Sequence, residues 1–521
     1  MKAISGRDEL MHPITRALGV AFCGGALVLS TQTWSAQAAE IEAGHVETID
    51  WKPCPEDATA ECGTLELPID YAKPLGEKFK LAVARRKATE AARRKGILLV
   101  NPGGPGGSGV DFAISAREHF SQQIQASFDI IGWDPRGVSR SAPVNCSQDL
   151  LNGSPSGFPA SQLEFDALAA YNRELRDDCR KRSGEIADHT DTGATIHDMD
   201  AIRRALGEQK INYYGVSYGT LMGQQYAERY GDRIRAMVID SNMDHSLGTW
   251  DFAATEAQAF ESSFQEWVKW CNRTISCALH GKDVVQVWEG LLAKADRGEL
   301  ANPDNPSRKL TARGIIGRAF GSFYGPEWKD LADFLAELDS QQPARHMSFG
   351  DEEINEVFQS AFCSDWSLPV RTFAEYKALT ATENAVAPHV RGGLLGHDAI
   401  LSCVGLREKV NNPQHKLNIR NAPKILMLNA LYDPATPYSW AVNAHRQTKD
   451  TTVLLTYEGW GHGVYGRSEC TTVTVDEYLL TLKMPRISRC AAVEPLDKAV
   501  LAPVSSKPPA GPAPRIPGWN R

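Results

Sequence analysis

Residues 210–223 read Lys210-Ile-Asn-Tyr-Tyr-Gly-Val-Ser217-Tyr-Gly-Thr-Leu-Met-Gly223. The short apolar and aromatic run at 211–214 predicts a buried strand, and residues 220–230 are compatible with a helix. Between them lies a G-x-S-x-G motif, which in a strand-turn-helix context is typical of a nucleophile elbow. Such an elbow holds its serine at a strained backbone corner, and the flanking glycines leave room for neighbouring backbone. We therefore expect the Oγ of Ser217 to project from a sheet at the start of a helix.

Strand and helix patterns alternate around this motif. Continuous apolar runs at 96–100 and 128–133 are typical of strands buried on both faces of a sheet. Further strands are expected at 235–240, 424–428 and 452–456. This alternation predicts a mostly parallel α/β sheet. Three leading strand-like runs predict an antiparallel edge, and they lie at 45–51, 62–69 and 78–86.

Two of the later strands are followed by residues suited to acyl transfer. Asp433 follows the strand at 424–428, and His462 lies between two glycines after the strand at 452–456. The order Ser217, Asp433, His462 is the chain order of the α/β-hydrolase fold. In that arrangement Asp433 orients His462, which takes the Ser217 proton and returns it to the leaving group. Asp244, after the preceding strand, is the competing acid, but Asp433 is nearer His462 in sequence and is followed by a Pro-initiated helix.

A glycine-rich loop follows the strand at 96–100. It reads Asn101-Pro-Gly-Gly-Pro-Gly-Gly-Ser-Gly109 and lacks the Lys-Ser/Thr ending of a P-loop. In a serine hydrolase this loop supplies one half of the oxyanion hole, and the backbone N–H after the nucleophile, here that of Tyr218, supplies the other. The turn that begins at Asp134 is expected to be closed by an internal pair with Arg136.

These motifs resemble those of a known family. The 101–109 loop, the Asp134 turn, the Ser217 elbow and the segments around Asp433 and His462 together resemble the secreted tripeptidyl aminopeptidase branch of the prolyl-aminopeptidase-like α/β hydrolases, over about residues 48 to 490. The resemblance implies a serine exopeptidase acting on free N-termini, with Gly104 as the oxyanion donor of the loop. Members of this branch are also described as carboxylesterases.

The pattern changes between residues 245 and 416, where helical stretches dominate and six tryptophans occur. A helical insertion between two sheet strands is expected to form a cap over the active site, with most tryptophans in its own core. We thus expect an α/β-hydrolase core at 39–244 and 417–492, a cap at 245–416 and an extended Pro-rich tail at 493–521.

An aminopeptidase requires an acidic group beneath the cap for the substrate ammonium. Asp365 is our candidate, whereas Glu256, Glu261 and Glu266 are expected to form a solvated helix face. A carboxylesterase would use the same triad with an apolar acyl pocket and no such acid. A non-catalytic binding protein is disfavoured because the triad is intact. Peptides or small esters are therefore the expected substrates, and no cofactor is expected.

The N-terminus has the layout of a secretory signal peptide at 1–38. A weakly basic segment is followed by a short apolar stretch and an Ala-Gln-Ala38 cleavage site. Ten cysteines remain after cleavage, and an even number in an exported chain predicts disulfides. Neighbour-to-neighbour pairing would give five local links, but the sequence does not determine the connectivity. Zinc is disfavoured because C-x-x-C pairs are lacking, so no metal is expected.

Charge and hydropathy exclude further classes of partner. The net charge of -8 and the pI of about 6.0 disfavour nucleic acid and anionic membranes. No later segment is apolar enough to predict a membrane span. We therefore expect a secreted or periplasmic enzyme, and its oligomeric state stays open.

Overall fold

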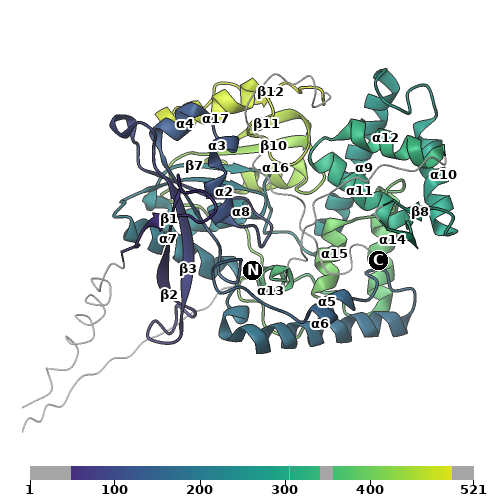
Figure 1. Cartoon of the computed structure of the whole chain (residues 1–521), viewed down its shortest axis with the longest axis horizontal. Coiled ribbons are helices and arrows are strands. Elements are labelled where there is room, and N and C mark those ends of the chain that lie inside the picture. Colours follow the sequence, from purple (N-terminus) through teal and green to yellow (C-terminus); the bar gives the residue numbers. More distant parts are fainter. Residues whose placement is uncertain (1–47, 304, 341–355, 496–521) are drawn as a thin grey trace, which may run out of the picture. The chain divides into compact units, whose positions relative to one another are not determined.

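The computed structural model describes residues 48–303, 305–340 and 356–495. At its centre is a ten-stranded sheet with the order β1-β2-β3-β5-β4-β6-β7-β10-β11-β12 (Figure 1). The first three strands and β5 pair antiparallel, and the remaining neighbours pair parallel. The predicted mixed sheet with an antiparallel edge is thus confirmed. The strands are β1 Lys52–Pro53, β2 Glu61–Pro68, β3 Lys78–Arg86, β4 Ile97–Asn101, β5 Asp129–Trp133, β6 Ile211–Val216, β7 Ile234–Asp240, β10 Ile425–Tyr432, β11 Thr452–Trp460 and β12 Arg489–Cys490.

One strand prediction is wrong. Residues 48–51 form no strand, while residues 45–47 lie outside the described part, and β1 begins only at Lys52. Ile49 instead packs on the face of β2 at Gly63, where a Cβ would lie 2.4 Å from the Ile49 Cγ2. Because Pro53 has no N–H to donate, the ladder also ends immediately.

Both faces of the central strands are covered. Adjacent residues enter different apolar clusters: Leu99 and Tyr213 belong to one, Leu98 and Tyr214 to the other. This period of two explains why the sequence of these strands is continuously apolar. The α-helices before β7 and after β10 are α2 Gly109–Ile114, α3 Ala116–His119, α4 Gln122–Ser127, α5 Gln148–Asn152, α6 Gln162–Ser183, α7 Thr192–Ala205, α8 Tyr218–Tyr230, α16 Tyr438–Gln447 and α17 Glu469–Thr481.

Between β7 and β10 the chain leaves the sheet and forms helices with a small hairpin. Figure 1 shows α9, α10, α11 and α12 gathered beside the sheet. These helices enclose an apolar cluster that includes Trp267, Trp288 and Trp328, as expected for core tryptophans, and Trp460 of β11 also belongs to it. Phe358 and Phe362 belong instead to a cluster shared with the sheet. The elements are α9 Thr249–Arg273, α10 Val284–Asp296, β8 Ala301–Asn302, β9 Asn305–Lys309, α11 Ala312–Tyr324, α12 Trp328–Asp339, α13 Phe358–Asp365, α14 Phe373–Val386 and α15 Leu395–Ser402.

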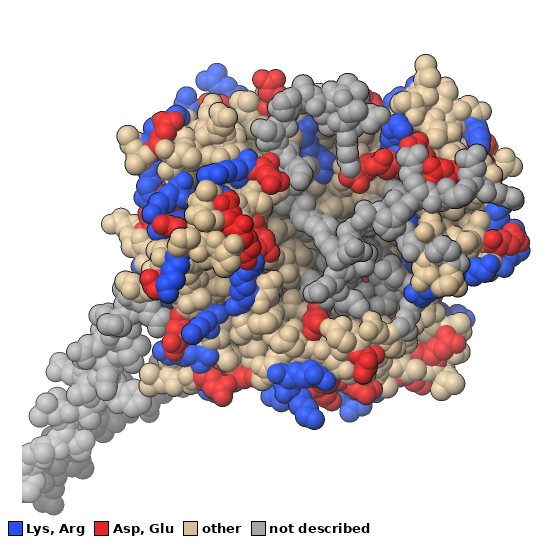
Figure 2. Space-filling model, in the orientation of Figure 1, with Lys and Arg blue, Asp and Glu red and all other residues tan. Residues whose placement is uncertain are grey.

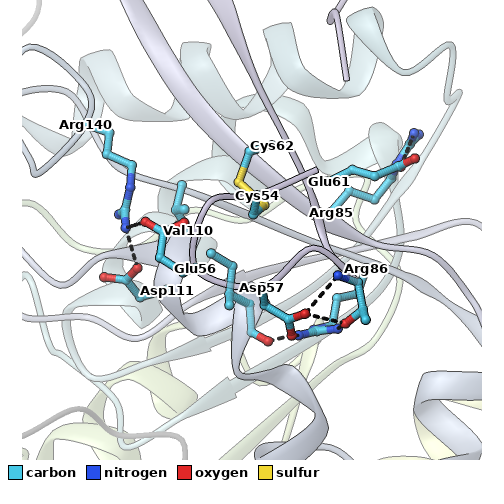
Figure 3. The surroundings of a disulfide bond; sticks show 12 residues. Cys54, Glu56, Asp57, Glu61, Cys62, Arg85, Arg86, Val110, Asp111 and Arg140 are labelled. Carbon is cyan, nitrogen blue, oxygen red and sulfur yellow. Dashed lines mark hydrogen bonds and ion pairs between the residues drawn. A yellow bond between two sulfur atoms is a disulfide. The ribbon is translucent and has the colours of Figure 1, made fainter. Parts of the chain in front are cut away.

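The ten cysteines form the predicted disulfides, and each pairs with its sequence neighbour. The disulfides are Cys54–Cys62, Cys146–Cys179, Cys271–Cys277, Cys363–Cys403 and Cys470–Cys490. The first closes the connection between β1 and β2 (Figure 3). Close to it, Arg86 pairs with Asp57 and Arg85 with Glu61.

Removing the last disulfide is expected to destabilise the protein. Cys470 and Cys490 join α17 to β12 across 20 residues. Because the link restricts the unfolded chain, replacing both cysteines by alanine should lower the free energy of unfolding by about 3 kcal/mol. Urea unfolding of the oxidised proteins measures this loss. Equal stability of the variant and the wild type would contradict it.

The surface accords with the charge balance of the sequence. Figure 2 shows basic and acidic side chains interspersed over the face in view. Among the described residues, no helix is both long and apolar enough to cross a lipid bilayer.

Candidate active site

Ser217, Asp433 and His462 follow the carboxyl ends of β6, β10 and β11. These strands and β7 are consecutive neighbours in the parallel part of the sheet. Because parallel strands end at the same edge, the three residues lie on the edge where α/β proteins bind their ligands.

Ser217 lies at a strained corner, as the elbow motif predicts. Its φ of 58° and ψ of -125° are unusual for a residue with a Cβ, and α8 begins at the next residue. The 101–109 loop passes directly above this corner. A Cβ at Gly103 would lie 2.5 Å from the Val216 carbonyl oxygen and 2.8 Å from the Ser217 Cβ, so only glycine fits there.

Asp134 holds the glycine-rich loop against β5. Its Oδ1 accepts hydrogen bonds from Ser108 Oγ at 2.5 Å and from the Val110 N–H at 3.1 Å, and its Oδ2 accepts one from the Arg140 N–H. The internal pair with Arg136 is not formed, because Arg136 binds the buried Asp198 at 2.7 Å. That part of the sequence interpretation is wrong, although the turn does have a structural role.

Asp433 and His462 are in direct contact. The Nδ1 of His462 lies 2.9 and 3.0 Å from the two carboxylate oxygens of Asp433. The backbone N–H groups of Ala435 and Thr436 also donate to this carboxylate. Burial acts to raise the pKa of Asp433, but the charge of His462 and these hydrogen bonds outweigh it, so the pKa lies below its usual value. Asp433 is therefore the negative partner of the imidazole.

Asp244, the competing acid, has other partners. Its carboxylate accepts hydrogen bonds from Ser246 Oγ, Asn443 Nδ2 and Gln447 Nε2. The structure thus brings Asp433 to His462 and ties Asp244 to α16.

The imidazole of His462, which contacts Asp433 through Nδ1, also packs against Tyr324, the last residue of α11. The ring of Tyr324 lies 4.5 Å from the imidazole, and its carbonyl oxygen accepts the His462 backbone N–H at 2.9 Å. Arg467 donates to the carbonyl oxygens of both His462 and Tyr324. The His462 Nε2 is buried and has no hydrogen-bond partner among the described residues. This nitrogen is therefore available to a reacting group, and such bonds commonly tighten only with substrate present.

Asp240, the last residue of β7, links the Ser217 corner to the His462 loop. Its carbonyl oxygen accepts the Ser217 N–H at 3.0 Å, and its carboxylate accepts the N–H groups of Val464 and Tyr465 at 2.8–2.9 Å. Sequence reasoning missed this role. Its only signal was an acid at the very end of a predicted strand.

A cavity opens beside Ser217. Gly104 and Tyr218, the two predicted oxyanion residues, line it together with Ser217 and Thr436, whose hydroxyl contacts both Asp433 and His462. The cavity is mainly apolar, with walls that include Met243, Phe252, Phe358, Phe362, Leu395 and Trp440. Among the described residues that line the cavity, Glu256 is the charged one.

Glu256 is buried, with an exposed fraction of 1%, and neither carboxylate oxygen has a hydrogen-bond partner of normal geometry among the described residues. Burial, together with the neighbouring Glu383, raises the pKa of Glu256 to about 8. The expected solvated helix face is wrong for all three glutamates, since Glu261 and Glu266 are buried as well.

Glu383 has a partner that Glu256 lacks. The Glu383 Oε2 lies 2.8 Å from His397 Nδ1, and His397 Nε2 lies 3.1 Å from the Gly157 carbonyl oxygen. A carbonyl only accepts, so Nε2 carries a proton, and Nδ1 shares another with the carboxylate. Burial opposes the charged imidazole, but Glu383 raises the pKa of His397 above its usual value. Glu383 is therefore paired with His397, whereas Glu256 has no ion-pair partner among the described residues; the Gly396 N–H and the charge of Arg313 lower its pKa only in part.

Asp365 does not line this cavity. It is fully buried, and its carboxylate accepts hydrogen bonds from the Thr192 N–H and hydroxyl, from Tyr218 Oη at 2.6 Å and from Asn412 Nδ2 at 2.6 Å. Its oxygens are thus occupied by the chain itself. The structure does not bring this predicted ammonium ligand to the site.

Asp365→Asn is therefore expected to act on the fold. Its amide would point an N–H at donors such as Tyr218 Oη, so we expect a loss of about 1–3 kcal/mol in the free energy of unfolding. Urea unfolding measures this loss. Peptide and ester hydrolysis should fall by the same factor, and a selective loss of free-amine substrates would restore Asp365 as a substrate ligand.

Two other clusters are explained without a ligand. A larger cavity at the β1–β3 edge is lined by Arg85, Arg86 and Glu61, but these charges are already paired within the chain. Asp70, Glu185 and His189 have metal-like spacing, yet the Lys73 ammonium lies 3.1 Å from Asp70 and 3.4 Å from Glu185.

Comparison with known proteins agrees with this fold. A family model described as alpha/beta hydrolase fold matches residues 96–314, and one described as TAP-like protein matches residues 394–490. The chain is 30% identical to the tripeptidyl aminopeptidase of Streptomyces coelicolor, over 86% of this chain and 88% of that protein. It is 27% identical to the serine protease Hip1 of Mycobacterium tuberculosis, over 91% and 96%.

A third relative has a different activity. The chain is 31% identical to carboxylesterase B of Mycobacterium tuberculosis, over 84% of this chain and 87% of that protein. The relatives therefore include two peptidases and an esterase, all of them hydrolases. By its family matches and its fold, the chain belongs to the tripeptidyl aminopeptidase-like family of α/β hydrolases and is a serine hydrolase.

Proposed function

We propose that this enzyme is an exported aminopeptidase that hydrolyses peptide bonds close to a free N-terminus. One observation carries the proposal: Glu256 places a buried, unpaired carboxylate in the same cavity as Ser217. A buried carboxylate without a partner is costly, and an ammonium group would supply the missing charge and hydrogen bonds. An ester substrate offers no such group.

The chemistry is that of a Ser-His-Asp triad. The Nε2 of His462 removes the proton of the Ser217 hydroxyl as the oxygen attacks the scissile carbonyl. Asp433 holds the Nδ1–H side of the imidazole and balances the positive charge that develops on it. The backbone N–H groups of Gly104 and Tyr218 stabilise the oxyanion. His462 then protonates the leaving amine, and water hydrolyses the acyl-enzyme on Ser217.

Glu256 takes the place of Asp365 as the proposed ligand of the substrate ammonium. In the free enzyme its raised pKa lets the group accept a proton instead of remaining a bare buried anion. The arriving ammonium replaces that proton and stabilises the carboxylate. Glu383 is already paired with His397, so Glu256 is the acid proposed to bind the substrate.

Carboxylesterase activity is the second candidate. The apolar walls of the cavity and the similarity to carboxylesterase B support it. An esterase, however, has no use for the carboxylate of Glu256 in an otherwise apolar cavity.

The proposal also includes export from the cytoplasm and the limits of the core and cap domains. Five disulfides are compatible with an oxidising compartment, which supports export with residues 1–38 as a cleaved signal peptide. The signal peptide and most of the tail at 493–521 lie outside the described residues. We assign the cap to 245–416 between the two core segments, 39–244 and 417–492.

A comparison of matched substrates tests the proposed function. The values of kcat/KM are measured for an aminoacyl p-nitroanilide, its N-acetyl derivative and a short-chain p-nitrophenyl ester. A free-amine substrate preferred over its acetylated form by at least tenfold supports the aminopeptidase. Preference for the acetylated anilide, or hydrolysis of the ester alone, would assign the enzyme as a carboxylesterase.

A further inference from the structure

The space between Glu256 and Ser217 is small. The volume free of atoms is ≈ 410 Å³ with the open mouth included, and the centres of water molecules can occupy only ≈ 40 Å³ of it. Since one water needs roughly 10–15 Å³ of such space, the enclosed part holds about three waters. That is room for one side chain of moderate size.

The helix that carries Glu256 also packs directly against the elements of the site. The Nε1 of Trp440 donates a hydrogen bond to Oγ1 of Thr255, the neighbour of Glu256, at 2.7 Å. Phe252, one helical turn before Glu256, packs on the Trp440 ring with 4.9 Å between the centroids. Trp440 lies in α16, which begins shortly after Asp433. The two helices are therefore in direct contact beside the cavity that Phe252, Glu256 and Trp440 line.

The geometry of a peptide sets how many residues fit between anchor and nucleophile. Within one residue the amine nitrogen and the carbonyl carbon are about 2.5 Å apart, whereas across three extended residues the distance approaches roughly 10 Å. If one residue separates the ammonium from the scissile carbonyl, both groups fit in the cavity that Glu256 and Ser217 share. A tripeptide would have to place three side chains in the same space.

We propose that the enzyme releases a single N-terminal residue with an apolar side chain, rather than a tripeptide. This inference rests on the proposed aminopeptidase function. The ammonium binds Glu256, and the first side chain packs against Met243, Phe252, Phe362 and Leu395. The Ser217 oxygen forms an ester with the first carbonyl carbon, and the C–N bond to the second residue breaks. His462 transfers the serine proton to the new amine of the leaving peptide. Water then hydrolyses the ester, which restores the Ser217 hydroxyl and releases one amino acid.

Anilides of increasing length test the inference on the full-length enzyme. Leu-, Ala-Leu- and Ala-Ala-Leu-p-nitroanilide share one leaving group and a free amine, and N-acetyl-Leu-p-nitroanilide serves as the blocked control. We expect kcat/KM to be highest for the one-residue substrate, by at least tenfold over the three-residue substrate. Colour from the three-residue anilide should appear after a lag, because two alanines must leave first.

The outcomes separate the two proposals. Immediate colour from Ala-Ala-Leu-p-nitroanilide, with the tripeptide as the first product in mass spectrometry, would overturn the single-residue inference and leave the aminopeptidase intact. Preference for the acetylated leucine would defeat the aminopeptidase itself. Stepwise mass losses of single residues from an unlabelled apolar peptide would confirm release of one residue at a time.

Discussion

Ser217→Ala is expected to lower kcat by about 10⁶-fold, because the nucleophile and its base act as a unit. For the same reason His462→Ala should cost about as much, and the double variant little more. Asp433→Asn should lower kcat by about 10⁴-fold, since the amide favours the wrong imidazole tautomer. Steady-state hydrolysis of an activated ester, which is sensitive enough to follow such losses, measures these values.

Covalent labelling checks the same assignment independently. A fluorophosphonate should modify Ser217 in the wild type and leave Ser217→Ala unlabelled. Ser262→Ala is a matched control, because Ser262 only donates a hydrogen bond to a carbonyl within α9. Its labelling and activity should equal those of the wild type. A fully active Ser217→Ala enzyme would rule out acyl transfer through this serine.

Glu256→Gln has the second largest expected effect, and it depends on the substrate. A charge-assisted hydrogen bond to the substrate ammonium is worth roughly 1.5–3 kcal/mol, or about ten- to a hundredfold in kcat/KM. We expect that loss with free-amine anilides and less than a twofold change with p-nitrophenyl esters. Esters do not use the anchor, while Ser217, His462 and the oxyanion residues are unchanged.

A matched variant separates this local effect from a change in overall charge. Glu289 is an exposed residue of α10, so Glu289→Gln removes one negative charge far from any buried contact. It should leave both reactions unchanged. Equal losses of anilide and ester hydrolysis in Glu256→Gln would show that Glu256 has no specific role in amine binding.

The raised pKa of Glu256 adds a dependence on pH. Burial favours the neutral carboxyl in the folded protein, with a pKa of about 8 against 4.5 in an exposed group. Its contribution to stability is therefore complete below pH 4.5 and is lost as the pH rises through 8. The stability of Glu256→Gln relative to the wild type should thus increase from pH 5 to pH 9 in urea unfolding. A constant difference would show that Glu256 does not titrate in this range.

Much of this fold was predictable from local patterns. Continuous apolar runs mark the buried strands, and residues that follow such strands must meet at one edge of a parallel sheet. Ser217, Asp433 and His462 are separated by up to 245 positions in sequence, yet strand order alone brings them to that edge. The elbow also needed no tertiary information, because the strain of Ser217 and the glycines around it are local properties of the chain.

The choice among the buried acidic residues was not decided by such patterns. One signal was present: Phe252, Glu256 and Phe260 are spaced by four and share one face of α9, which places Glu256 on an apolar stripe. The periodicity shows that Glu256 is buried, but it does not show whether hydrogen-bond donors surround its carboxylate. Asp365 has four such donors, whereas Glu256 has none of normal geometry among the described residues, and this difference arises from segments far apart in sequence.

The sequence by itself therefore determined most of the strands, the elbow and the order of the candidate catalytic residues, because each depends on short-range spacing or on strand order, whereas the disulfide connectivity was decided by the folded chain. Only the tertiary structure decided which buried acid faces the nucleophile and how much space separates them. Those properties depend on how α9, α15 and α16 pack together, and no local pattern encodes the packing of three distant helices.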